Sequence, residues 1–202
     1  MSTKSNEIRK AQQAAWEMRE RRRRILIWSL VALVGVLAVG ALVYLVWQDT
    51  RPIPRTGVDV PIQGAEHIEV GTAHEPYSSN PPTSGPHYAQ WSEAGFYEQA
   101  PLDENLVHSL EHGYVIISYD CARLTDGDCD GLKKQIRDAM SAGGTSQYTN
   151  TPKLIAVPRA GMESLLALTS WGHMDTFDQF DRGRILDYVR AFRDQAPEPY
   201  AP

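Results

Sequence analysis

The chain contains six histidines, and their spacing is the feature most able to do chemistry. His108 and His112 lie four residues apart in a helix-like segment, so both imidazoles face the same side. Neutral imidazole is the commonest metal ligand in proteins, and such a pair can present two nitrogens to one ion. The spacing therefore indicates a metal site.

Three further histidines are candidates to complete that site. His87 closes a proline-rich loop and is the expected third ligand, and His74 or His67 is expected to complete the shell. Glu111 would hydrogen-bond one of these imidazoles and orient it, without binding the ion itself. These ligands suit zinc or copper, and a nearby thioether would favour copper. The alternative is that these are ordinary polar histidines bonded to the backbone.

The string His108-Ser109-Leu110-Glu111-His112 also matches the His-x-x-Glu-His pattern of inverted zinc peptidases, in which the glutamate is the general base. That arrangement needs a sustained helix and a downstream carboxylate ligand, whereas Gly113 and a strand-like run follow here. A zinc-dependent hydrolase is therefore an alternative to the function that we expect, which is metal binding without catalysis. The sequence has no Gly-x-Ser-x-Gly elbow and no dinucleotide fingerprint.

An unbroken apolar run from Ile25 to Trp47 predicts a membrane anchor. As a helix it would reach about 34 Å, enough to cross a hydrocarbon core of about 30 Å. Arg21 to Arg24 precede it, and basic residues stay on the cytoplasmic side. A cleaved signal peptide, the alternative, has an apolar region of only about 7–15 residues. We therefore expect a single-pass protein of the cell membrane with a cytoplasmic N-terminus.

Composition divides the chain into four parts: a basic cytoplasmic segment, 1–24; the anchor, 25–47; a linker rich in proline and glycine, 48–65; and one extracytoplasmic domain, 66–202. The first 24 residues hold 8 Lys/Arg and 3 Asp/Glu, whereas the remainder holds 12 and 22. An acidic exported part would repel phosphate backbones, which excludes nucleic acid as a partner. Surface contact within a membrane protein complex, as an accessory or assembly protein, is a further alternative.

The two cysteines, Cys121 and Cys129, both follow the anchor. Disulfides persist outside the cytoplasm, so we expect these residues to pair. A redox-active pair is the alternative, but its usual spacing is Cys-x-x-Cys.

Hydrophobic patterns predict an α+β domain. The expected order is helix, strand, helix, strand, strand, helix, over residues 103–112, 114–119, 132–143, 153–157, 165–171 and 181–194. The sheet would be mixed, or antiparallel where the last two strands adjoin, with helices packed on it. A long loop before the first helix, residues 75–86, has no Val, Ile, Leu or Met, and its prolines and small polar residues favour an ordered conformation.

Two segments carry a family resemblance. Residues 77–88 contain Ser-Asn-Pro-Pro-Thr-Ser-Gly-Pro-His, and residues 106–113 contain His-Ser-Leu-Glu-His-Gly. They look like the signatures of domain-of-unknown-function family 3105, which is largely bacterial and often membrane-anchored. The family supplies no activity, but the resemblance implies that the loop and the histidine pair share one site. The loop residues concerned are Asn80, Pro81, Pro82, Thr83, Ser84 and Gly85.

Overall fold

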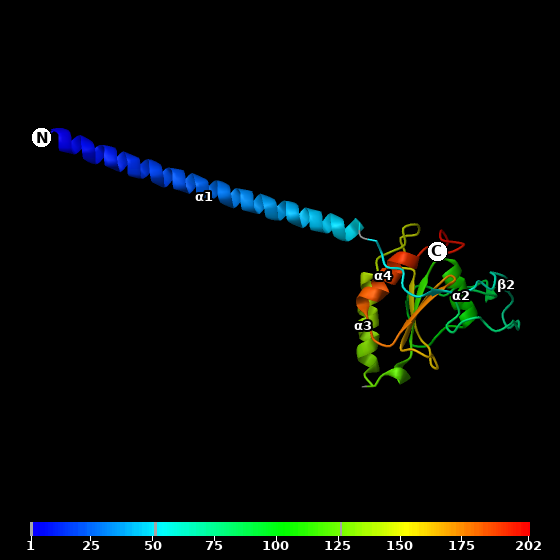
Figure 1. Ribbon diagram of the computed structural model, residues 1–202. Helices are drawn as coiled ribbons and strands as arrows, with labels where there is room; N and C mark the ends of the chain where they lie inside the picture. The colour runs from blue at the N-terminus through cyan, green and yellow to red at the C-terminus, as the bar shows by residue number, and fades with distance from the viewer. Residues whose placement is uncertain (1, 51, 126) are drawn as a thin grey trace. The chain divides into compact units, whose positions relative to one another are not determined.

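The computed structural model describes residues 2–50, 52–125 and 127–202, which belong to two compact units, Met1–Pro52 and Ile53–Pro202. The first unit contains the long helix α1, Ser2–Thr50 (Figure 1). Its stretch Met18–Trp47 is long and apolar enough to cross a membrane. The large apolar side chains of this stretch are exposed instead of packed into a protein core.

The second unit is built on a mixed six-stranded sheet with the strand order β1-β8-β7-β5-β6-β4. The strands are β1 (Val58–Asp59), β4 (Gly95–Phe96), β5 (Val115–Tyr119), β6 (Leu154–Pro158), β7 (Leu166–Ser170) and β8 (His173–Phe177). β6 runs parallel to β4 and β5, whereas β7 is antiparallel to β5 and β8. Every residue of β5 is buried, which suits its central place.

Helices cover both faces of this sheet (Figure 1). Side chains alternate along a strand, and Val115, Ile117 and Tyr119 of β5 belong to the core with α3 (Cys129–Ala142) and α4 (Arg182–Phe192). Ile116 points to the other face, where it packs with Leu106 and Leu110 of α2 (Asp103–Glu111). The predicted α+β class is therefore confirmed.

A small parallel ribbon lies beside α2. It consists of β2 (His67–Ile68) and β3 (His87–Tyr88), and β3 contacts α2. The ribbon belongs to a separate sheet from the six-stranded one. It places two histidines beside α2, which carries His108 and is followed at once by His112.

Both ends of α2 are fixed by contacts with other parts of the chain. Asp103 begins the helix without capping it, because its carboxylate binds the guanidinium of Arg159 at 2.6 and 2.9 Å, and Leu102 occupies the cap position. At the other end, Gly113 has φ +86°, and a Cβ there would lie 2.8 Å from the Cα of Asp194. Glycine is needed both for this conformation and for this close approach.

Three features of the domain differ from the sequence prediction. β6 and β7 do not adjoin, because the fully buried β5 lies between them. Strand β8 was not predicted, since its residues His-Met-Asp-Thr-Phe mix polar and apolar types without a β-branched run. Two residues of the predicted linker 48–65, Val58 and Asp59, pair with β8 as an edge strand too short to recognise in sequence.

The predicted disulfide is present. Cys121 and Cys129 are bonded and join the 3-10 helix η1 (Cys121–Arg123) to the start of α3. The bridge therefore closes a short local loop instead of linking distant elements.

Candidate metal site

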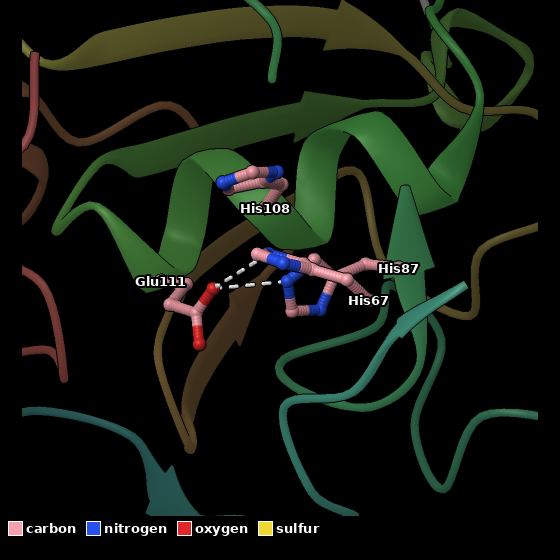
Figure 2. A group of neighbouring side chains, drawn as sticks. All are labelled: His67, His87, His108 and Glu111. Carbon is pink, nitrogen blue, oxygen red and sulfur yellow. Dashed lines mark hydrogen bonds and ion pairs between the residues drawn. The ribbon is translucent and has the colours of Figure 1, made fainter. Parts of the chain in front are cut away.

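Three imidazoles and one carboxylate meet where the β2–β3 ribbon faces α2. One ligand atom from each of His67, His87, His108 and Glu111 lies within 4.8 Å of the others (Figure 2). We call these four residues the histidine cluster. His87, His108 and Glu111 are buried, whereas His67 reaches solvent. Such a set of nitrogen and oxygen donors could hold a metal ion.

The backbone of the ribbon and the helix explains why these side chains converge. His67 and His87 are register partners in a parallel pair, so their side chains project from the same face of the ribbon. His108 and Glu111 are three residues apart on α2 and share one face of that helix. Figure 2 shows the two pairs pointing toward each other.

Two backbone carbonyls set the hydrogen positions on the buried imidazoles. Nδ1 of His87 donates to the carbonyl of Gly85 at 2.8 Å, and Nδ1 of His108 donates to that of Tyr88 at 2.6 Å. A carbonyl oxygen can only accept, so each Nδ1 carries the hydrogen. In the neutral ring the lone pair is then on Nε2. Metal-binding histidines are oriented in this way in many proteins.

The Nε2 atoms face other acceptors of the cluster. Nε2 of His87 lies 2.9 Å from Oε2 of Glu111, and Nε2 of His67 lies 3.6 Å from the same oxygen. Within the described residues, Nε2 of His108 makes no hydrogen bond. A carboxylate oxygen and an imidazole lone pair at 2.9 Å need a proton or a cation between them. One metal ion could satisfy several of these lone pairs together.

The electrostatics of the cluster favour neutral imidazole at His108. Burial, together with the neighbouring rings of His112, His87 and His67, lowers the pKa of His108 to about 4, although the hydrogen bond to the Tyr88 carbonyl opposes this shift. The lone pair of His108 is therefore free to bind a metal at neutral pH.

The proline-rich loop, residues 77–86, positions His87. The Tyr77 hydroxyl donates to the carbonyl of Pro86 at 2.8 Å, and the hydroxyl of Ser84 accepts from the backbone N–H of Gln63 at 3.0 Å. Gly85 has φ +130°, and a Cβ there would lie 2.9 Å from the ring of Tyr77. The loop therefore places the backbone carbonyl of Gly85 where it can hold the ring of His87.

Arg159 joins the loop to the start of α2. Its Nε donates to the side-chain oxygen of Asn80 at 2.6 Å, while its two terminal nitrogens bind Asp103. The loop residues that follow Asn80 are buried, namely Pro81, Pro82, Thr83 and Ser84. The loop residues named from the sequence thus support the site, and none of them belongs to the cluster.

His112 lies next to the cluster and not in it. Its ring centroid is 4.5 Å from that of His108, as the helical spacing predicts. However, Nδ1 of His112 lies 3.1 Å from the carbonyl oxygen of Pro202 and Nε2 lies 3.6 Å from Glu198. Nδ1 is therefore hydrogen-bonded to the C-terminal segment, and Nε2 faces a carboxylate of the same segment. The ammonium of buried Lys153 strengthens this end by donating to the carbonyl of His112 at 2.7 Å.

The other predicted residues occupy varied positions. His74 lies outside the cluster, with Nε2 3.3 Å from Glu104 and Nδ1 2.7 Å from the carbonyl of Glu75. His67 lies within the cluster. The sequence had indicated either His74 or His67 as the residue that completes the set of ligands. Glu111 contributes a carboxylate oxygen to the cluster. The sequence had indicated that it orients an imidazole without binding the ion.

Sequence reasoning missed the aromatic neighbours and the carbonyl contacts of the cluster. The Trp91 ring lies 6.0 Å from that of His108, and the Trp171 ring lies 6.4 Å from that of His87. Trp171 follows β7, and its approach to the loop depends on tertiary packing. No local pattern in the sequence predicts such contacts.

Fold and site together define a class of protein: a small α+β domain with a histidine and carboxylate cluster, in a chain that also has a long apolar N-terminal helix. The chain belongs to the family described as Protein of unknown function (DUF3105), whose model matches residues 67–202. The match begins at His67 and includes all four cluster residues. No curated protein and no solved structure matches the chain.

Proposed function

We propose that this protein is a membrane-anchored, extracytoplasmic metal-binding domain that holds one zinc or copper(II) ion at the histidine cluster without catalysing a reaction. The observation that carries the proposal is the convergence of three imidazoles and a carboxylate. The Nδ1 atoms of His87 and His108 are each bonded to a backbone carbonyl. A hydrogen bond of this kind fixes the tautomer and the ring orientation of a metal-binding histidine.

The donor atoms support zinc(II) or copper(II) over copper(I). Imidazole and carboxylate groups are donors of borderline and hard character, whereas copper(I) is selected by thiolate and thioether sulfur. The cluster contains no sulfur, and Cys121 and Cys129 are bonded to each other. Met174, beside His173 in sequence, lies on β8 and pairs with Val58. The thioether that would favour copper is therefore not among the donors of the cluster.

The membrane topology rests on the charges beside the anchor. Arg21 to Arg24 mark the cytoplasmic side, which places the acidic remainder of the chain outside, where it attracts cations. An accessory role in a membrane protein complex is a separate proposal. Co-purification of the full chain with a larger complex would support it.

The geometry does not favour hydrolysis. The His-x-x-Glu-His mechanism needs both histidines as ligands and the glutamate as a free base. Here the nitrogens of His112 face Pro202 and Glu198, and Glu111 lies among the cluster donors.

Elemental analysis of the purified full-length protein in detergent tests the metal proposal. After removal of metal and reloading with zinc or copper(II), we expect one ion per chain. His87→Ala and His108→Ala should lose that ion, while His74→Gln, a histidine outside the cluster, should keep it. Wild-type protein that stays metal-free after reloading would refute the proposal.

A further inference from the structure

The four members of the histidine cluster differ in how firmly they are held. The side chain of His87 is 0% exposed and that of Glu111 is 6% exposed, whereas that of His67 is 49% exposed. His87 and His108 each have a carbonyl that holds the ring. Within the described residues, the nitrogens of His67 contact only Glu111, at the long distance of 3.6 Å.

The backbone that carries His67 is hydrogen-bonded on one side: the N–H of His87 donates to the carbonyl of Glu66 at 3.0 Å, and the N–H of Gly85 donates to that of Gly64 at 3.1 Å. Strand β2 has two residues, and it pairs with β3 on one side only. The neighbouring residues Glu66 and Glu69 are exposed. The side chain of His67 is half-exposed and, among the described residues, has no close hydrogen bond, so its ring can turn away from the cluster by side-chain rotation. The backbone bonds of β2 and the packing of α2 on the sheet then stay in place.

The ring of His67 covers the buried part of the cluster. Its centroid lies 4.8 Å from that of His87 and 4.8 Å from that of His108. Figure 2 shows the His67 ring beside that of His87, with the carboxylate of Glu111 reaching both. The solvent-exposed side of the cluster is thus the side of His67, and the two exposed glutamates next to it would attract cations.

We propose that His67 is the exchange ligand of the histidine cluster, so that the ion enters and leaves past this side chain and the site passes metal to and from external chelating groups. This inference rests on the proposed metal-binding function. In the exchange step a donor atom of the incoming chelator forms a bond to the ion, and the bond from the imidazole of His67 breaks. The ring leaves as neutral imidazole, and His87, His108 and Glu111 hold the ion until further donors arrive.

Zinc release from the full-length protein in detergent tests this proposal. Zinc-loaded protein is mixed with increasing concentrations of a chromogenic zinc chelator, and the release rate is recorded. For wild type we expect the rate to rise with chelator concentration, because the chelator attacks an ion that is still partly bound. A rate independent of chelator concentration would contradict the proposal.

Variants locate the exchange at His67. His67→Ala and His67→Gln should still bind one zinc at saturation, with affinity reduced at least about tenfold and release at least about tenfold faster. His74→Gln, the matched control, should behave as wild type. Release at the wild-type rate from both His67 variants would overturn the inference. Wild-type protein that loads no zinc would instead refute the metal-binding function itself.

Discussion

Two corners of this domain combine histidine with a carboxylate, and they do so with different results. At the edge of the main sheet, His173 has Nε2 2.8 Å from the carbonyl of Thr56 and Nδ1 2.8 Å from the carboxylate of Asp59. In the histidine cluster, His87 has the same pair of partner types, the carbonyl of Gly85 and the carboxylate of Glu111. The partners of a single ring therefore do not identify a metal site.

The difference lies in what surrounds each pair. The side chain of Asp59 is 95% exposed, so water can hydrogen-bond its carboxylate. Glu111 is buried, and the rings of His67 and His108 stand within 5.0 Å of that of His87. Protons on several adjacent buried rings would repel one another, whereas one divalent ion can bind all the lone pairs. The two corners therefore differ in that several imidazoles meet at one point in the histidine cluster, whereas His173 has no other imidazole beside it among the contacts described.

The largest effect that separates the corners should be stabilisation by metal. With free zinc at about 100 times the dissociation constant, binding should raise the free energy of unfolding by about 2.7 kcal/mol. We expect thermal unfolding of the full chain in detergent to show this gain for wild type and for His173→Ala, but not for His108→Ala. Loss of the gain in His173→Ala would break the comparison.

A smaller effect should appear without metal. His173→Ala removes two partly buried hydrogen bonds and a ring stacked 4.0 Å from that of Phe192, so we expect it to lower the free energy of unfolding by about 1–3 kcal/mol. His67→Ala, at a half-exposed ring, should change it by no more than about 0.5 kcal/mol. Denaturant unfolding of the metal-free proteins measures both. Equal losses would show that the two histidines have the same structural role.

The smallest expected effect is on pH dependence beside His173. Burial would raise the pKa of Asp175, but hydrogen bonds from Arg184 and Thr56 outweigh burial and lower it. A lowered pKa contributes stability above the unfolded-state value of about 3.9, and this stability is lost as the pH falls through the folded-state value.

Asp175→Asn tests this contribution. We expect the variant to be less stable than wild type at neutral pH, and the difference to shrink as the pH falls below about 4. Unfolding curves recorded from pH 6 to pH 3 would show it. A constant difference over this range would mean that the charge of Asp175 is not responsible.

The sequence predicted the elements that have strong local patterns. The run Val115–Tyr119 is rich in β-branched and aromatic residues and forms the buried strand β5, and the apolar spacing of Ile185, Val189 and Phe192 marked α4. The apolar stretch of α1 and the pairing of Cys121 with Cys129 followed from composition and spacing. Such features depend on residues that are close together in the sequence.

The site was predicted less completely because it depends on contacts between distant segments. Helical spacing placed His112 beside His108, but not the C-terminal residues that occupy its nitrogens. The pairing of His67 with His87 joins residues 20 positions apart through a two-residue strand, which has no periodicity to read. The place of Glu111 in the cluster depends on the 2.9 Å contact between its Oε2 and Nε2 of His87, a residue from a different element.

The placement of the indole rings has a practical consequence. The chain has five tryptophans; Trp16, Trp28 and Trp47 belong to α1, whereas the ring centroids of Trp91 and Trp171 lie 6.0 and 6.4 Å from rings of the histidine cluster. Light emitted by these last two arises a few ångströms from the ligands. A paramagnetic ion such as copper(II) would quench it, while zinc with its closed d shell would leave it largely intact. The protein thus carries its own optical reporter, which distinguishes the two candidate metals without any label.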